Sequence, residues 1–252
     1  MVGVQQEAIA SRECESALFG GRKQFGLAEL ERSEFANLAR RITFPARSTI
    51  FAESQPSTAI YMLRSGTAAL YNMLPDGRRQ ILGFALPGDF LGSPFSDRYT
   101  FSVDAISEVT AHQFLREGFL TFLQANPKSM YLMLEVALRE TNAARDHTLL
   151  LGRRSAEEKL VGFILDWRAR VGRRGALANL VPLPMCRRDV ADYVGLTIET
   201  ISRVLKKLEQ EHVIRVLPKA LQLMGPTERP LLFDRGRPRS PCLPSGVSGG
   251  KG

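Results

Sequence analysis

Residues 187–208 read RRDVADYVGLTIETISRVLKKL, and this stretch decides the fold of the C-terminal part of the chain. Val190 and Val194 fall on one face of a first helix, and small Ala191 stands where a second helix must cross closely. Gly195 supplies the tight turn that follows, because glycine adopts the left-handed backbone conformation without steric cost. The spacing of these residues predicts a helix-turn-helix.

The second helix of this motif has two different sides. Its apolar stripe consists of Ile201, Val204, Leu205 and Leu208, and its polar side carries Glu199, Ser202, Arg203 and Lys206 at positions i, i+3, i+4 and i+7. A polar side alone indicates only a solvated surface, but here it follows the turn of a helix-turn-helix. Glu can accept a hydrogen bond from cytosine N4, and Arg can donate two to guanine O6 and N7. The segment therefore predicts a protein that binds double-stranded DNA.

Phosphate contacts are expected on both sides of the base-reading residues, where they would set the register of the protein on the duplex. The expected set is Arg187, Arg188, Thr197, Thr200, Lys206 and Lys207, and Thr197 also has the residue type of a helix N-cap. The next segment, HVIRVLPKALQLMG, predicts two short strands that form a wing. Arg215 or Lys219 of this wing could contact the DNA backbone. A capping-box sequence at Ser155 marks the start of this predicted DNA-binding domain, residues 154–225.

A long helix is predicted upstream, over residues 127–153, and it opens at Asn126-Pro127. Apolar and small residues recur alternately four and three positions apart at Met130, Leu134, Ala137, Thr141, Ala144, Thr148 and Leu151. This heptad seam predicts a close two-helix contact and hence a homodimer. An ordinary amphipathic helix packed on its own domain is the alternative.

The part before this helix predicts β-structure. Residues 26–126 begin with a short predicted helix over 27–41 and continue as short segments with period-two alternation. Turn residues such as Pro75-Asp76-Gly77 separate these segments, as in an antiparallel roll or barrel. Residues 1–25 are predicted to be a flexible arm, and the Pro-, Gly-, Ser- and Arg-rich residues 226–252 a disordered basic tail. The fold class is therefore α+β.

Charge is distributed unevenly along the 252 residues. Residues 1–151 carry 15 Lys and Arg against 16 Asp and Glu, residues 152–225 carry 14 against 8, and residues 226–252 carry 5 against 2. A near-neutral part followed by a basic part suits binding to phosphate, because each cation that meets a phosphate releases condensed counterions. A solvated basic surface is the alternative explanation.

The composition also excludes other classes of protein. No stretch is apolar and long enough to cross a bilayer, and the N-terminus has no secretory-signal pattern, so we expect a cytoplasmic protein. Cys14, Cys186 and Cys242 lie too far apart for a zinc motif, and three thiols fall short of the usual four iron-sulfur ligands. No catalytic constellation or phosphate loop is present, which argues against an enzyme.

Across about residues 25–225 the chain resembles the CRP/FNR family of regulators, and most closely its FixK-like branch. The resemblance lies in LPDGRRQILGFALPGDFLG (74–92), LLGRRSAEEK (150–159) and LPMCRRDVADYVGLTIETISR (183–203). It implies a cyclic-nucleotide-binding-type β-roll, a long dimerisation helix and a C-terminal winged helix-turn-helix. It also implies base reading by Ile198, Glu199, Ser202 and Arg203. Ile198 stands where the CRP branch has Arg, which implies an inverted TTGA-type half-site.

The resemblance also bears on effectors. The family members that bind cyclic AMP use a Glu and an Arg-Ser or Arg-Thr pair, and here Ser93 and Tyr99-Thr100 stand at those places. The N-terminal cysteine cluster of FNR is absent as well. We therefore expect neither cyclic-nucleotide binding of the usual kind nor an iron-sulfur centre, and predict no cofactor and no metal. His112 and His147 are candidate haem ligands, or else packed or surface histidines.

Cys186 allows a redox hypothesis. It precedes Arg187 and Arg188 at the start of a helix, where positive charge would lower the pKa of its thiol and favour oxidation. Oxidation to a charged sulfinate or sulfonate would repel DNA phosphate. An inert small residue is the alternative.

The sequence thus predicts a transcription activator that recruits RNA polymerase. The resemblance implies that its target genes serve low-oxygen or nitrogen-oxide metabolism. The alternative is a ligand-gated regulator, in which the β-roll binds an unidentified small molecule and shifts the dimer helix between two states.

Overall fold

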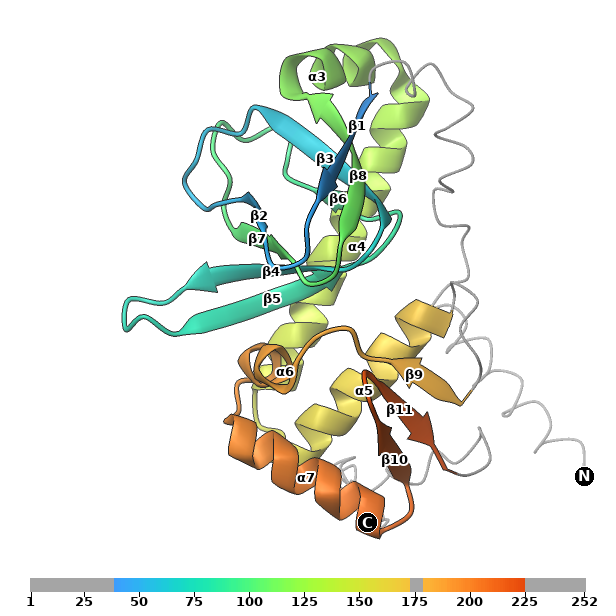
Figure 1. The fold of residues 1–252 in the computed structure, drawn as a ribbon. Helices are drawn as coiled ribbons and strands as arrows, with labels where there is room; N and C mark the ends of the chain where they lie inside the picture. Colours follow the sequence, from blue (N-terminus) through green and yellow to red (C-terminus); the bar gives the residue numbers. More distant parts are fainter. Residues whose placement is uncertain (1–38, 173–178, 225–252) are drawn as a thin grey trace, which may run out of the picture.

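The computed structural model describes residues 39–172 and 179–224, which form a β-roll and a DNA-binding-type part connected through a long helix (Figure 1). The predicted arm, residues 1–25, and the predicted tail, residues 226–252, lie outside the described residues. Within the described ranges no helix is both long and apolar enough to cross a membrane.

The roll consists of two four-stranded antiparallel sheets. Their strand orders are β1-β8-β3-β6 and β2-β7-β4-β5. The strands are β1 (Ala39–Phe44), β2 (Thr49–Phe51), β3 (Ala59–Ser65), β4 (Ala68–Met73), β5 (Arg79–Ala85), β6 (Phe90–Leu91), β7 (Ser102–Ala105) and β8 (Val109–Leu115). The predicted antiparallel roll is therefore confirmed.

The predicted helix over residues 27–41 is wrong at its end. Residues 39–41 belong to β1, which pairs along its length with β8. This pairing supplies backbone hydrogen bonds that a helix end would have to find elsewhere, so the tertiary contact overrides the local pattern. The earlier residues of this prediction lie outside the described part of the chain.

Strands β4 and β5 form a hairpin that reaches the C-terminal part of the molecule (Figure 1). Its turn is the predicted Pro75-Asp76-Gly77, in which Gly77 has φ +80° and the Leu74 N–H donates to the Arg78 carbonyl at 2.8 Å. A left-handed residue is needed there, and glycine takes that conformation without strain. The hairpin thereby carries Arg79 and Gln80 toward the helix-turn-helix.

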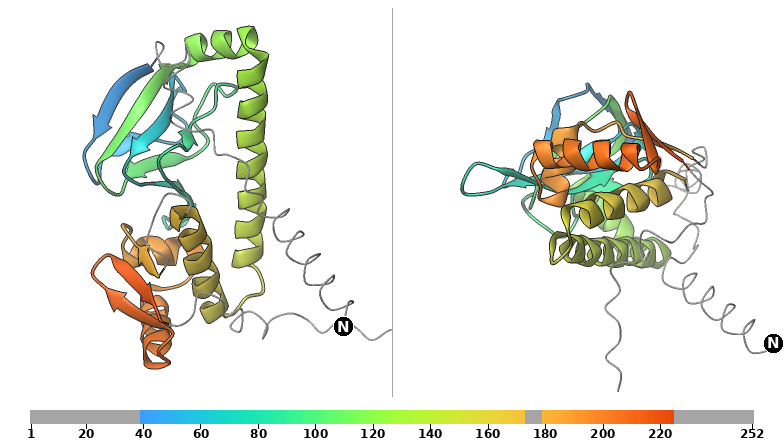
Figure 2. Two further views of the ribbon diagram at one scale, coloured as in Figure 1. Left: turned by 90° about the vertical axis from the view of Figure 1, so that its right-hand side faces the viewer. Right: turned by 90° about the horizontal axis from the view of Figure 1, so that it is seen from below.

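Two helices follow the roll. Helix α3 (Arg116–Ala125), which the sequence analysis did not predict, buries Phe119 and Leu123 against the roll. Helix α4 (Pro127–Leu151) begins with the expected proline and has 25 residues, which makes it about 37 Å long. Figure 2 shows the roll and the C-terminal part on the same side of α4, so α4 spans both of them.

The C-terminal part has the predicted winged helix-turn-helix architecture. Its elements are α5 (Ala156–Gly172), β9 (Leu180–Pro182), α6 (Arg187–Val194), α7 (Ile198–Gln210), β10 (Ile214–Leu217) and β11 (Ala220–Leu223). The capping box at the start of α5 is present, since Ser155 Oγ accepts from the Glu158 N–H at 3.2 Å. The core of this part also includes Ile81 and Phe84 of β5, so it continues into the roll.

Candidate nucleic-acid interface

The helix-turn-helix is held together by local packing. Val190, Ala191 and Val194 of α6 are buried, and Gly195 has φ +66° and ψ +43°. A Cβ atom at Gly195 would also lie 3.3 Å from Cδ2 of Leu151. The turn is therefore left-handed and closely packed, as the sequence predicted.

The start of α7 is capped by a side chain. The Thr200 N–H donates to Oγ1 of Thr197 at 3.2 Å, and the two threonine hydroxyls lie 3.1 Å apart. Ile201 and the three other residues of the predicted apolar stripe are buried. The Thr197 cap and the buried side of α7 are therefore confirmed, and the two hydroxyls lie together at the exposed end of the helix.

The opposite side of α7 faces solvent. Glu199, Arg203 and Lys206 are exposed, Ser202 is half-buried, and Ile198 is an exposed apolar residue. Hydrogen bonds from the Glu199 backbone N–H and the Thr197 hydroxyl hold the pKa of the Glu199 carboxyl below its usual value. Glu199 is therefore an ionised carboxylate, a hydrogen-bond acceptor only, which suits the amino group of cytosine.

The predicted phosphate contacts fall into two groups. Arg187 and Arg188 are exposed at the start of α6, and Arg187 Nη1 donates to Ser202 Oγ at 3.3 Å. Lys207, by contrast, forms an ion pair with Glu157 of α5 and lies 3.8 Å from Glu211. A phosphate at Lys207 would compete with these carboxylates, whereas Arg187 lies beside the polar side of α7.

Sequence reasoning missed the contact that holds α6 against the roll. Arg79 of β5 donates to Asp189 at 2.5 Å and to Asp192 at 2.9 Å, and Gln80 Nε2 donates to the Asp192 carbonyl at 2.8 Å. The pairs join residues 110 and 113 positions apart, so no local pattern signals them. The one sequence signal for this contact is that Arg79 and Gln80 lie in the stretch 74–92, which carries part of the family resemblance.

An aromatic contact joins α4 to the same helix. The ring of His147 stacks on Tyr193 of α6, with centroids 4.1 Å apart and planes 4° apart. His147 Nε2 lies 2.8 Å from the Tyr193 carbonyl, which can only accept, so Nε2 carries the hydrogen. Burial lowers the pKa of His147, which favours its neutral form. Helix α6 is thereby fixed to both the roll and α4.

The two candidate haem ligands are both engaged in such contacts. Nε2 of His147 is taken by the Tyr193 carbonyl, and Nε2 of His112 lies 3.0 Å from the Arg64 guanidinium. These positions suit the alternative of packed histidines better than haem ligation. Among the residues the structure describes, no cluster of three His, Cys, Asp or Glu side chains could hold a metal ion.

The pKa expectation for Cys186 is wrong. Partial burial and the neighbouring Asp189 carboxylate raise the pKa of the Cys186 thiol. The sequence placed two arginines beside the thiol, but the structure also places an acid there, whose side chain accepts from the Cys186 N–H at 2.9 Å. The redox role of Cys186 therefore stays a prediction without the low pKa that motivated it.

The predicted dimer seam lies mostly on the solvent side of α4. Leu134, Ala137, Thr141, Ala144 and Thr148 are exposed, whereas Met130 packs against the roll and Leu151 against the helix-turn-helix. Tyr131, Leu138 and Leu149, which the sequence analysis did not include, are each more than half exposed. The exposed apolar surface of α4 is therefore wider than the predicted seam. The first and last residues of the seam, Met130 and Leu151, pack within the chain.

The core of the roll contains stacked aromatic side chains among aliphatic ones. The rings of Phe51 and Tyr99 stack with centroids 3.8 Å apart, and the Tyr99 hydroxyl donates to the Ala59 carbonyl at 2.7 Å. Burial raises the pKa of Tyr99 to about 12. Arg98, beside Tyr99, donates to the Ser54 carbonyl at 2.6 Å. These residues do not fit a cyclic nucleotide, which needs a cation aimed at its phosphate.

Comparison with known proteins agrees with this architecture. Residues 41–126 match the cyclic nucleotide-binding domain, and residues 183–214 match the crp family of bacterial regulatory proteins. The nitrogen fixation regulation protein FixK of Bradyrhizobium diazoefficiens is 47% identical over 78% of this chain and 83% of its own. The transcriptional activatory protein AadR of Rhodopseudomonas palustris is 45% identical over 79% of this chain and 84% of its own.

A solved structure is similar over the same region. The structure of FixK2 from Bradyrhizobium japonicum has a TM-score of 0.72 and 30% sequence identity, and the match covers 80% of this chain and 99% of that one. These relatives are named as regulators rather than as enzymes. The chain belongs to the CRP/FNR family of bacterial regulatory proteins, in its FixK-like branch.

Proposed function

We propose that the protein is a transcription activator that binds DNA as a homodimer and reads inverted TTGA-type half-sites with α7. Ile198, Glu199, Ser202 and Arg203 would contact bases, and the cations around them would contact phosphates. Such a regulator recruits RNA polymerase, and we infer target genes in low-oxygen or nitrogen-oxide metabolism. The names of FixK, a nitrogen fixation regulation protein, and AadR, a transcriptional activatory protein, support the role of a transcription activator.

The exposed side of α7 carries this proposal. Ionised Glu199 and exposed Arg203 lie one helical turn apart on that side. The half-site TTGA contains a single G·C pair, which offers an amino donor on cytosine and two acceptors on guanine. The two side chains therefore match the two edges of that pair.

The exposed side of α4 supports the dimer. Its threonines satisfy their own hydroxyls within the helix, since Thr141 Oγ1 donates to the Ala137 carbonyl at 2.8 Å and Thr148 Oγ1 to the Ala144 carbonyl at 2.9 Å. A second helix can therefore cover them without burying an unsatisfied polar group. Leu134 and Leu138 add apolar area to the same side.

The packed roll supports activity without a bound effector. Phe51 and Tyr99 stack within the buried core of the roll, and a small molecule bound there would have to displace these side chains. The fixed contacts of Arg79 and His147 hold α6 in place in the unliganded chain. We therefore propose that the unliganded dimer is the form that binds DNA.

The test is fluorescence anisotropy of a labelled duplex at fixed salt, with purified protein and no added ligand. The duplex carries inverted TTGA half-sites about one helical turn, roughly 10 base pairs, apart from centre to centre. We expect the wild-type protein to bind it at least about a thousandfold more tightly than a scrambled duplex.

Two arginine variants separate base reading from charge. Arg203→Ala should weaken binding to the TTGA duplex by roughly 10- to 100-fold, the contribution of one bidentate contact to guanine. Arg215→Ala removes the same charge from the wing and should weaken binding to both duplexes equally. Equal affinity of a dimeric wild-type protein for both duplexes would refute the proposed half-site.

A further inference from the structure

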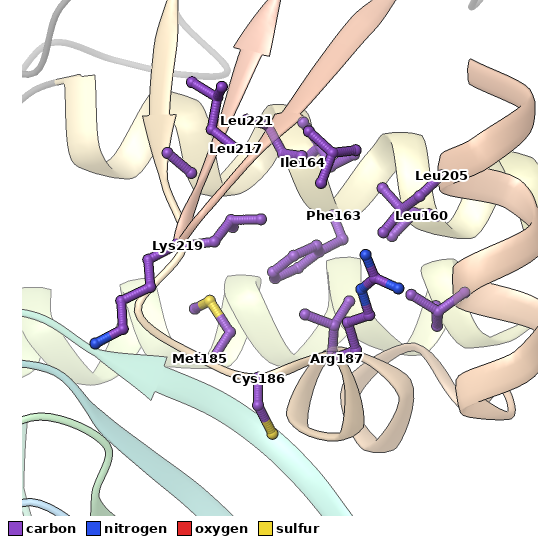
Figure 3. A pocket seen from close by; sticks show the side chains of 15 residues that line it. Leu160, Phe163, Ile164, Met185, Cys186, Arg187, Leu205, Leu217, Lys219 and Leu221 are labelled. Carbon is purple, nitrogen blue, oxygen red and sulfur yellow. The ribbon is translucent and has the colours of Figure 1, made fainter. Parts of the chain in front are cut away.

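A pocket of about 300 Å³ lies inside the DNA-binding part, between α5, α6, α7 and the β10–β11 hairpin (Figure 3). Its walls are apolar and include Phe163 and Ile164 of α5, Met185, Leu205 of α7 and Leu221 of β11. All five are buried. The volume is at the lower end of the range for small-molecule sites, about 300–1,000 Å³.

The charged groups around the pocket have one sign. Arg187 and Lys219 line it, and none of the described residues that line it is Asp or Glu. Figure 3 shows Arg187 pointing from α6 toward α7, whereas Lys219 extends from the hairpin on the opposite side and points outward, and the Cys186 thiol points away from the centre. An apolar interior with the Arg187 guanidinium at one side suits a small molecule with an apolar body and an anionic head.

We propose that this pocket binds a small aromatic or aliphatic carboxylate, with its apolar body among Phe163, Met185 and Leu205 and its carboxylate on Arg187. The Arg187 side chain is exposed, so packing of the core does not require its guanidinium. Burial of the apolar body supplies the favourable free energy, and the guanidinium selects the acid over a neutral analogue.

Arg187 couples this pocket to the DNA-binding face. Its Nη1 donates to Ser202 Oγ at 3.3 Å, and Ser202 lies on the polar side of α7 beside Arg203. A carboxylate in the pocket and a DNA phosphate outside it would therefore compete for one guanidinium. Ligand and DNA must then weaken each other by the same factor, because coupling between two sites is reciprocal. This competition rests on the proposed DNA reading by α7, whereas binding of the carboxylate does not.

The first test is isothermal titration calorimetry of the full chain with 2-naphthoate and with 2-naphthamide, its neutral analogue. We expect the acid to bind at least about tenfold more tightly, the contribution of one charge-assisted hydrogen bond. Arg187→Gln should remove most of this preference, whereas Lys219→Asn, which removes a cation on the opposite side of the pocket, should leave most of it in place. Asn is chosen because Lys219 has φ +57°, a conformation that Asn tolerates. No binding of the acid at millimolar concentration, or equal binding of acid and amide, would overturn the proposal.

The second test repeats the anisotropy titration on the TTGA duplex with saturating 2-naphthoate. We expect DNA affinity to fall several-fold, and Ala220→Phe, which fills the pocket, to bind DNA like the wild-type protein but to be insensitive to 2-naphthoate. Thermal unfolding checks that this variant folds, and if it does not, Val216→Phe, at another residue that lines the pocket, takes its place. Unchanged DNA affinity in the wild-type protein despite bound 2-naphthoate would overturn the competition. If the wild-type protein fails to bind the duplex without ligand, the proposed function fails and calorimetry still decides the pocket.

Discussion

The two sides of the helix-turn-helix use charge differently. On the side of α7 that faces solvent, Glu199, Arg203 and Lys206 are exposed. On the side of α6 that faces the roll, Asp189 is 13% exposed and its partner Arg79 24%. The first set is available to a partner, and the second is already paired within the chain.

This difference separates binding from positioning. Exposed charges contribute little to the stability of the chain, so they can be matched to DNA without destabilising the fold. Half-buried charges need their partners, because an unpaired one loses hydration without compensation. The roll-facing pairs therefore fix the orientation of α6, and the solvent-facing residues determine what α7 can bind.

In the proposed homodimer, separation of the two copies should weaken DNA binding the most, since one helix-turn-helix can occupy only one half-site. Leu134→Glu places a charge on the exposed side of α4 and should give a monomer with at least about 100-fold weaker binding to the two-fold duplex. Leu82→Glu, which changes an exposed leucine of the roll, is the matched control. Sedimentation velocity measures the oligomeric state, and anisotropy measures the affinity for DNA. Tight DNA binding by a monomer would contradict the proposed binding as a homodimer.

The next effect tests the roll-facing side. Arg79→Ala leaves the half-buried Asp189 and Asp192 without their guanidinium partner. It should lower the free energy of unfolding by about 2 kcal/mol, a value between the cost of breaking an exposed ion pair and that of breaking a buried one. Arg78→Ala is the neighbouring control, because Arg78 is exposed and pairs only with exposed Asp76 among the described residues; it should change the free energy by less than about 0.5 kcal/mol. Urea unfolding that gives equal values for both variants would contradict a positioning role for Arg79.

A smaller effect concerns pH. The pKa of His147 in the folded chain lies below the unfolded value of 6.5, so the folded state favours the neutral ring. This contribution to stability is fully present above pH 6.5 and is lost as the pH falls toward the folded pKa. Urea midpoints at pH 8 and pH 5.5 should therefore differ more for the wild-type protein than for His147→Phe. An identical pH dependence in the two proteins would exclude His147 as the cause.

The smallest effect distinguishes two adjacent lysines. Lys206→Ala should reduce the salt dependence of DNA binding by about one phosphate contact. Lys207→Ala should reduce it less, because Glu157 and Glu211 already neutralise that ammonium. Anisotropy titrations at several salt concentrations give both slopes. A larger loss for Lys207 would mean that DNA displaces the ion pair with Glu157.

Local patterns made the helix-turn-helix predictable. The stripe from Ile201 to Leu208 and the turn at Gly195 follow from helical periodicity and from glycine's backbone freedom, and both are confirmed. The antiparallel roll was equally readable from alternation and turns. Helix α3 was missed because it follows β8 directly at Arg116, and no capping side chain marks the change from strand to helix.

Long-range contacts could not be read in the same way. Arg79 meets Asp189 across 110 positions, and the pKa of Cys186 depends on an acid whose orientation the sequence does not specify. The seam on α4 was predicted from spacing, but only the folded chain reveals that Leu151 packs against the turn at Gly195. Side chains at the junction of the two parts depend on how those parts dock.

The most direct test of base reading by α7 combines a protein change with a DNA change. Wild-type protein and Glu199→Ala are titrated against the TTGA duplex and against a duplex in which the G·C pair of both half-sites is replaced by A·T. If Glu199 accepts from that cytosine, the wild-type protein should discriminate between the duplexes by about 1–3 kcal/mol per half-site, and the variant should lose part of this discrimination, because Arg203 still contacts the guanine of the same pair. If the variant keeps the full discrimination, Glu199 does not read that cytosine, and if the wild-type protein binds both duplexes equally, α7 does not read that base pair.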